Sequence, residues 1–291
     1  MFSIIIPLYN KADYIAETLK SVLNQTYCDY EVIVVNDSST DNSLEVASSF
    51  QDERIHIYTK ENEGVSAARN YGIMHAKYDY IAFLGKDAIW DYDSLECQKK
   101  LIGTYPDAGI YSTAFYSLEK GKRKLRNVLI NEHTHFLVHD YFKESVMNGL
   151  SICWTSSLCL KKEVIKEIPM FRVGIKRGED LDLWLRIALN YDVAYLNLPK
   201  VFYRTGLSDS LTSDYSKNGE FPYYEWFNFT SESSYYRKYV ILVVYIHAKN
   251  AFIHHDYDTC LAELWSVKTI AWRFKWAERL LLLVISWIKS K

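Results

Sequence analysis

The segments FSIIIPLYN, residues 2–10, and EVIVVND, residues 31–37, decide the fold class. Each is a short apolar run that ends in polar residues, and residues 13–25 between them carry apolar side chains at helical spacing. Continuous apolar strands separated by amphipathic helices are typical of a mostly parallel sheet with helices on both faces. We therefore expect an α/β fold of the Rossmann-like kind.

The same alternation continues along the N-terminal part of the chain. Helical patterns follow at 43–50 and 64–75, and apolar strands at 54–59 and 80–85. In sheets of this kind, ligands bind beyond the carboxyl ends of the strands. The polar residues that follow the strands are therefore candidates for one site: Tyr9, Asn10, Asn36, Asp37, Asn62, Lys86 and Asp87.

The middle of the chain has a different pattern. Residues 108–128 fit two strands around a Gly-Lys turn. Residues 153–160 fit a short strand followed by a helix, 177–191 a helix, and 192–204 further strands. Residues 206–222 are rich in Ser, Gly and Asp, which predicts a loop or lid.

The composition is typical of a soluble globular protein. Of 291 residues, 49% are hydrophobic and 24% charged, and the formal net charge of −2 gives no indication of a nucleic-acid partner. The five cysteines are scattered without a C-x-x-C pair, which predicts reduced thiols and a cytoplasmic protein. The apolar run after Met1 is too short for a signal peptide and reads as a strand.

Residues 262–291 are basic and aromatic, with six Lys or Arg, two Glu and four Trp. Their apolar runs are far shorter than the roughly 20 residues needed to cross a bilayer. One interpretation is an amphipathic helix lying on an anionic membrane. This predicts a peripheral position at the inner face of the cytoplasmic membrane. The other is a helix that packs on the body of the protein, with its basic residues in solvent.

Two motifs carry chemically useful groups. Asp37 stands where the chain leaves a strand, and its carboxylate can accept a hydrogen bond from a base or a ribose hydroxyl. A turn or a helix cap would use the same residue structurally. Gly64 opens a helix that carries Arg69 one turn in, which suits a phosphate at the helix N-terminus. The alternative for Arg69 is a solvated helix face.

Five motifs taken together resemble the family-2 glycosyltransferases of the GT-A fold. They are SIIIPLYN, VIVVNDSSTDNS, NEGVSAARNYG, YIAFLGKDAIWD and GEDLDLWLR, in this order. The resemblance covers about residues 1–205. It implies a GT-A domain with a nucleotide-sugar-binding half at 1–105 and an acceptor and catalytic half at 106–210. A loop and a helical region that could associate with a membrane would follow at 211–291.

The resemblance also implies a nucleotide-diphosphate sugar as donor, commonly with uracil as the base, and transfer with inversion. Asp87 matches the last acid of the D-x-D motif, which usually carries Mg²⁺ or Mn²⁺ between the donor phosphates. Asp180 matches the catalytic base, with Glu179 beside it. The resemblance implies nucleotide binding by Pro7, Tyr9, Asp37 and Arg69. The strand ends add Asn10, Asn62 and Lys86 to the expected nucleotide-binding residues.

Asp180 also has a physical case of its own. It begins a predicted helix, where the positive end of the dipole favours a charged carboxylate. Such a carboxylate can take the proton of an acceptor hydroxyl, which accelerates transfer by roughly 10²–10⁴-fold. A cap at the helix start is the structural alternative, and Asp182 is a competing acid further in.

The sequence departs from the family pattern on the diphosphate side. The acidic turn reads Gly85-Lys86-Asp87-Ala88 instead of D-x-D-D, and Thr205 and Gly206 stand near where a His often follows the Tyr-Arg pair. Asp87 alone could still hold Mg²⁺, which often takes one or two protein ligands. Alternatively Lys86 supplies the positive charge, or the enzyme is impaired.

Two functions follow. The first is an inverting glycosyltransferase that adds a sugar to a glycan or lipid-linked acceptor, as in bacterial surface polysaccharide synthesis. The second is a catalytically impaired relative that binds nucleotide or glycan and acts as a scaffold. A dehydrogenase is disfavoured because no G-x-G-x-x-G follows the first strand. The donor sugar, the acceptor and the oligomeric state are not readable from the sequence.

Overall fold

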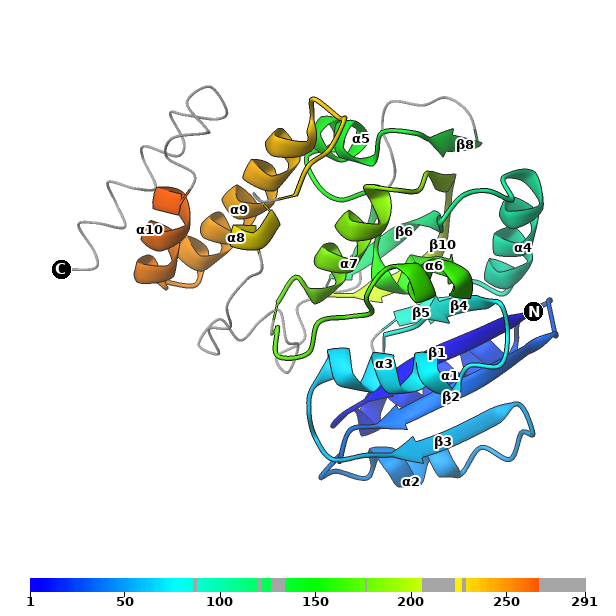
Figure 1. Cartoon of the computed structure of the whole chain (residues 1–291). Helices are drawn as coiled ribbons and strands as arrows, with labels where there is room; N and C mark the ends of the chain where they lie inside the picture. Colours follow the sequence, from blue (N-terminus) through cyan, green and yellow to red (C-terminus); the bar gives the residue numbers. More distant parts are fainter. Residues whose placement is uncertain are drawn as a thin grey trace.

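β1 (Phe2–Leu8) is buried along its whole length because helices cover both faces of its sheet (Figure 1). Successive side chains of a strand point to opposite faces. Accordingly Ile5 packs into one core, whereas Ile4 and Ile6 pack into a second core on the other face. β2 (Tyr30–Asn36) is parallel to β1 and equally buried. The two apolar runs that predicted the fold class thus form adjacent internal strands of the sheet.

The computed structural model describes residues 1–85, 88–119, 122–126, 134–175, 177–205, 223–226 and 229–266. Within these residues, ten strands form one sheet. Its order is β3 (Ile55–Thr59), β2, β1, β4 (Tyr80–Phe83), β9 (Leu158–Lys161), β6 (Ile110–Glu119), β10 (Val193–Arg204) and β5 (Ala88–Trp90). β7 (Lys122–Arg126) pairs with β6, and β8 (His135–Val138) pairs with β10.

The sheet joins the two halves of the chain. Strands β3, β2, β1 and β4 are parallel, as the alternation predicted. β9 runs antiparallel to both β4 and β6, and β6 is parallel to β10. The short strand β5 was not predicted, since three residues are too few to show a pattern, and it pairs with β10 at the far edge. The boundaries expected at 1–105, 106–210 and 211–291 stay predictions.

Two groups of helices cover the two faces. α1 (Ala12–Leu23), α2 (Ser43–Ser48) and α4 (Ser94–Thr104) contribute to the core that holds Ile4. α3 (Val65–His75), α6 (Lys162–Glu167) and α7 (Glu179–Ala188) contribute to the core that holds Ile5. A single 3₁₀ turn, η1 (Thr155–Ser157), leads into β9.

The C-terminal helices are α8 (Tyr223–Trp226), α9 (Tyr236–Ile253) and α10 (Tyr257–Ser266). α9 packs against α5 (Tyr141–Asn148), which belongs to the middle of the chain. The hydroxyls of Tyr141 and Tyr239 lie 2.8 Å apart and join α5 to α9, and α10 lies against α9 (Figure 1). In the part of the chain that the structure describes, every helix is too short or too polar to span a bilayer.

The expected helical region after Tyr223 is confirmed as far as Ser266. α10 contains residues 262–266 of the basic segment and packs against α9. The predicted loop at 206–222 and the tail at 267–291 lie outside the described residues, so the membrane interpretation of 262–291 stays a prediction.

Candidate active site

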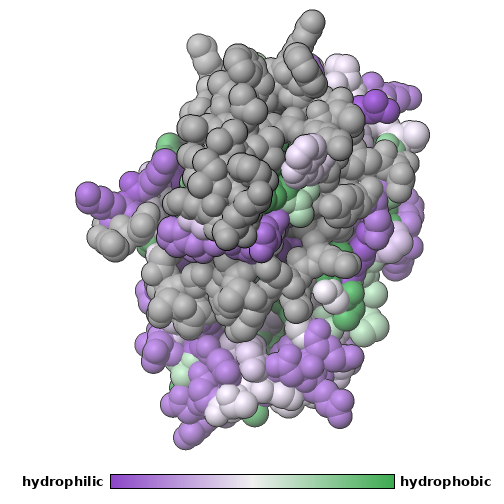
Figure 2. Space-filling view, turned by 90° about the vertical axis from the view of Figure 1, so that its left-hand side faces the viewer, coloured by the Kyte–Doolittle hydropathy of each residue, from purple (hydrophilic) through white to green (hydrophobic). Residues whose placement is uncertain are grey.

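The carboxyl ends of β1, β2 and β4 lie at one edge of the sheet, on the left in Figure 1. Tyr9 and Asn10 follow β1, Asp37 follows β2, and Gly85 follows β4 closely. Lys86 and Asp87, the expected diphosphate and metal residues, lie outside the described residues. Figure 2 views the molecule from this side, and the described surface in its lower part is mainly hydrophilic.

Asp37 is almost fully buried, with 3% of its surface exposed, and it organises the start of α3. Its Oδ1 accepts hydrogen bonds from Lys60 Nζ at 3.0 Å and from the backbone N–H of Glu63 at 3.1 Å. Its Oδ2 accepts the N–H of Gly64 at 2.9 Å. Gly64 has φ +89°, a left-handed conformation that favours glycine. Asp37 thus holds the turn before α3, and a carboxylate with about four acceptor positions retains room for one further donor.

Asn10 has a similar local task. It lies in the left-handed region with φ +48°, which Asn tolerates better than most residues. Its Oδ1 accepts the backbone N–H of Thr40 at 2.8 Å, and its own N–H donates to Ser39 Oγ at 3.2 Å. Asn10 therefore fastens the turn after β2 to the end of β1.

The remaining expected nucleotide residues of this edge differ in exposure. Pro7 is buried within β1, opposite Val35 of β2. Tyr9 is 39% exposed directly after the strand. Asn62 is exposed in the turn that Asp37 holds. Tyr9 and Asn62 are thus accessible at the edge, whereas Pro7 belongs to the strand itself.

Arg69 connects this edge to the acids of α7. Its Nη1 donates to Glu179 Oε1 at 2.8 Å, although 110 residues separate the two in sequence. Its guanidinium also lies over the ring of Phe171, 5.0 Å from the centroid. Arg69 is only 8% exposed, and its Nε has no hydrogen-bond partner within the described residues. The fold therefore places the NEGVSAARN and GED motifs in direct contact.

Glu179, the first residue of α7, is the partner of that arginine and is largely enclosed, with 12% of its side chain exposed. Burial raises the pKa of Glu179, the neighbouring charge of Asp180 raises it further, and Arg69 opposes both effects. The arginine thus offsets the cost of placing two adjacent acids at the helix start.

Asp180 lies in the first turn of α7 and is partly exposed. Its Oδ2 accepts the hydroxyl of Thr155 at 2.8 Å, and its Oδ1 accepts the backbone N–H of Leu181 at 2.8 Å. These contacts fix the direction of the carboxylate and leave it further acceptor positions. The arrangement suits a group that accepts a proton. Sequence reasoning missed Thr155, because a Thr-Ser-Ser run carries no signal of a partner 25 residues away.

Asp182, the competing acid, has a structural role. It is completely buried, and its Oδ2 accepts Arg186 Nε at 2.9 Å. Its Oδ1 accepts the indole N–H of Trp226 at 2.9 Å, which ties α8 to α7. With no exposed surface and both oxygens bonded, Asp182 is not available to a substrate.

The flanks of the expected metal turn are well anchored. The backbone N–H of Ala88 donates to Gly85 O at 3.0 Å, and that of Gly85 donates to Ser156 Oγ at 2.9 Å. Among the described residues, no three His, Cys, Asp or Glu side chains gather as a metal site would require.

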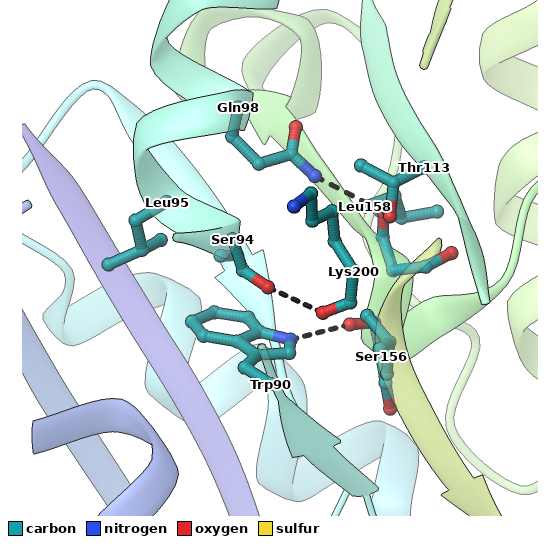
Figure 3. Close-up of a pocket in the computed structure, with 11 residues that line it drawn as sticks. Trp90, Ser94, Leu95, Gln98, Thr113, Ser156, Leu158 and Lys200 are labelled. Carbon is teal, nitrogen blue, oxygen red and sulfur yellow. Dashed lines mark hydrogen bonds between the residues drawn. The ribbon is translucent and has the colours of Figure 1, made fainter. Parts of the chain in front are cut away.

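A small cavity lies next to these anchors (Figure 3). Its walls include Trp90, Gln98, Thr113 and Ser156, and the Trp90 indole donates to Ser156 O at 2.8 Å. Its volume of about 10 Å³ is roughly the room that one water molecule needs. The cavity is therefore a feature of the packing between α4, β5 and η1 and is too small for a sugar.

Comparison with known proteins places this geometry in a family. The family model described as "Glycosyl transferase family 2" matches residues 3–168. A Bacillus subtilis glycosyltransferase named for teichuronic acid biosynthesis, TuaG, is 31% identical over 198 residues, which cover 67% of this chain and 75% of TuaG. A glycosyltransferase of Rickettsia felis is 35% identical over 64% of this chain, but the chain spans only 30% of its length.

Solved structures agree on the fold. S. aureus TarS 1-349, determined in complex with UDP-GlcNAc, has a TM-score of 0.64 at 16% identity, covering 98% of this chain and 79% of that one. The mannosyltransferase PcManGT from Pyrobaculum calidifontis, in complex with GDP-Man and Mn²⁺, has a TM-score of 0.61 at 17% identity, covering 99% and 86%. The family match spans more than half of the sequence, and the fold is that of GT-A enzymes. The chain therefore belongs to glycosyl transferase family 2.

Proposed function

We propose that this protein is an inverting glycosyltransferase that transfers a sugar from a nucleotide-diphosphate sugar, most simply a UDP-sugar, to a glycan or lipid-linked acceptor. The contact between Arg69 and Glu179 carries the proposal, because it brings the helix start on the donor side next to Asp180. The start of α3, which suits an anion, and a carboxylate base would then serve one site.

In this mechanism Asp180 is the general base. The oxygen of an acceptor hydroxyl attacks the anomeric carbon of the donor while Asp180 takes the hydroxyl proton. The bond between the anomeric carbon and the phosphate oxygen breaks, and the nucleoside diphosphate leaves with that electron pair. Attack from the face opposite the leaving group inverts the anomeric centre. Thr155 and the N–H of Leu181 direct the carboxylate.

The nucleotide is assigned to the edge formed by Pro7, Tyr9, Asn10 and Asp37. Asp37 would accept one N–H of the base with its remaining acceptor position, and Tyr9 offers an exposed ring beside it. Arg69, whose guanidinium is already held by Glu179, would place its positive charge near the ribose or diphosphate. TarS with UDP-GlcNAc and PcManGT with GDP-Man support a nucleotide-sugar donor in this fold.

A divalent cation held by Asp87 beside the donor diphosphate fits the proposal. The complex of PcManGT contains Mn²⁺, and bound Mg²⁺ or Mn²⁺ would neutralise charge that develops on the leaving diphosphate. Asp87 would be its protein ligand, with water and phosphate oxygens completing the shell. Calorimetry of UDP with and without Mn²⁺, on wild type and Asp87→Ala, tests this. Equal affinity in all four titrations would remove the metal from the proposal.

The decisive experiment is donor turnover in Asp180→Asn. Release of nucleotide from a radiolabelled UDP-sugar is expected to fall by about 10²–10⁴-fold, while UDP affinity stays within about twofold, since binding does not need the base. Glu163→Gln, on the exposed face of α6, is the matched control and should retain activity. Tight UDP binding without turnover of any donor in wild type would favour the scaffold function.

The proposal also places the protein at the inner face of the cytoplasmic membrane, through residues 262–291. Their six Lys or Arg and four Trp support contact with anionic lipid. Co-sedimentation with vesicles of phosphatidylglycerol should fall when Lys and Arg of this segment are replaced by Gln. Unchanged binding would exclude the electrostatic contact.

A further inference from the structure

Three consecutive residues, Trp154, Thr155 and Ser156, connect the two sides of the candidate site, and we call them the bridging segment. Thr155 and Ser156 are almost completely buried, at 5% and 2% exposure. Buried hydroxyls are held by hydrogen bonds. Here those bonds reach two separate parts of the site.

The first bond leads to the base. Thr155 Oγ1 donates to Asp180 Oδ2 at 2.8 Å. A hydrogen bond from a hydroxyl to a charged carboxylate is stronger than one between neutral groups. Thr155 therefore selects one orientation of the carboxylate at the start of α7.

The second bond leads to the donor side. Ser156 Oγ accepts the backbone N–H of Gly85 at 2.9 Å, directly before Lys86 and Asp87. The Ser156 carbonyl accepts the indole N–H of Trp90 at 2.8 Å, just beyond the same turn (Figure 3). Ser156 thus anchors both flanks of the turn assigned to the diphosphate.

The bridging segment is itself held in place. The ring of Trp154 stacks on Phe115 of β6, with centroids 4.8 Å apart and planes 20° apart. It also contacts Tyr203 of β10, at 4.0 Å between centroids. Two strands of the sheet therefore fix the Trp154 ring. This also restricts the positions of the Thr155 and Ser156 hydroxyls that follow it.

We infer that Thr155 and Ser156 are positioning residues that set the base and the diphosphate turn at a fixed separation. The inference rests on the proposed function. Thr155 acts on the chemical step through Asp180, and Ser156 acts on donor binding through Gly85. Because the two act on different parts of the site, their substitutions should have separable kinetic effects.

The test compares Thr155→Val and Ser156→Ala. A panel of UDP-sugars is first ranked by thermal shift, and the strongest stabiliser serves as donor. Thr155→Val should lower kcat by about 10- to 100-fold, the range for a hydrogen bond to a charged group, with donor KM and UDP affinity within about twofold. Ser156→Ala should raise donor KM and UDP Kd by about 2- to 10-fold, the range for a neutral hydrogen bond, with kcat nearly unchanged.

Two further variants exclude a general packing effect. Thr155→Ser keeps the hydroxyl and should restore kcat to within about threefold of wild type. Ser157→Ala is the matched control, because Ser157 is equally buried and its hydroxyl donates within the same turn, to the carbonyl of Trp154 at 3.0 Å, rather than to Asp180 or to the residues around Gly85. UDP binding by calorimetry gives a readout for Ser156 that does not depend on turnover.

Wild-type kcat in Thr155→Val, with Asp180→Asn inactive, would overturn the role of Thr155. Equal changes of kcat and KM in Thr155→Val and Ser156→Ala would show that the segment only supports the fold. Activity in Asp180→Asn is a different failure, because it would overturn the proposed base whatever Thr155 does.

Discussion

Asp37 at the end of β2 and Asp180 at the start of α7 are both motif acids beside the same edge, but their surroundings differ. Asp37 is 3% exposed and accepts three hydrogen bonds, two of them from backbone N–H groups of the turn before α3. Asp180 is partly exposed, and the hydroxyl of Thr155 donates to its carboxylate. The carboxylate of Asp37 is thus buried and holds a turn in place. The carboxylate of Asp180 is oriented by its hydrogen bonds but stays accessible to solvent.

The difference separates two ways of serving a site. An acid whose acceptor positions are mostly occupied contributes shape to a binding edge, and its loss is felt in folding. An acid with free acceptor positions contributes chemistry, and its loss is felt in turnover. The same distinction places Asp182 with Asp37, since both of its oxygens are bonded inside the protein.

The largest expected change in stability tests the contrast between Asp37 and Asp180 directly. Asp37→Ala should lower the free energy of unfolding by about 3 kcal/mol, because it leaves two backbone N–H groups without their acceptor and removes one of the two carboxylates that pair with Lys60. Asp180→Asn should lower it by less than about 1 kcal/mol, since an amide oxygen still accepts the Thr155 hydroxyl. Urea denaturation followed by circular dichroism measures both.

Asp107→Ala is the control, because that acid is exposed and its removal should change stability by less than about 0.5 kcal/mol. If Asp180→Asn were as destabilising as Asp37→Ala, Asp180 would be a structural cap and the contrast between the two acids would disappear.

The next largest effect concerns the ion pair between Arg69 of α3 and Glu179 of α7. Arg69→Met leaves Glu179 buried without its countercharge and should cost about 2 kcal/mol of unfolding free energy. Adding Glu179→Gln should recover about half of that loss, because the uncompensated charge is then gone. A double-mutant cycle from the same denaturation curves gives the coupling energy. A coupling near zero would mean that the ion pair does not join the two halves.

The fold class could be predicted because its signal is local. Apolar runs such as FSIIIPLYN are buried on both faces, and this shows in the sequence as uninterrupted hydrophobicity. β5 escaped prediction, since its three residues owe their strand conformation to pairing with β10. A strand that forms only by pairing with a distant segment shows no hydrophobic periodicity in its own sequence.

For the candidate site, the sequence likewise predicted the residues but not their contacts. The motifs located Asp37, Arg69 and Asp180, but not what each one touches. The use of Asp37 by the turn before α3, and of Asp180 by Thr155, depends on contacts across 26 and 25 residues. Such pairs are set by the packing of the sheet and helices, which no single stretch of sequence contains.

The smallest expected effect compares the pH response of the two regions. Hydrogen bonding by Arg54 holds the pKa of Asp52, before β3, at about 2. An acid with a lowered pKa stabilises the fold above its ordinary pKa, and the contribution is lost as pH falls toward 2. The pair is partly exposed, with 27% and 23% of the side chains accessible, so it should contribute at most about 1 kcal/mol.

Glu179 should respond in the opposite sense. Burial raises its pKa, so the folded state holds a proton that the unfolded state has already released. The free energy of unfolding then decreases as pH rises from the ordinary glutamate pKa to the raised one. Glu179→Gln should remove this decrease, and Asp52→Asn should remove only the loss at low pH. Unfolding free energies measured from pH 2 to 7 would show whether the two halves carry opposite slopes. If the free energy of unfolding changed with pH in the same way in both variants, the contrast would be wrong. The fold would then not disfavour the charged form of Glu179 while favouring the charged form of Asp52.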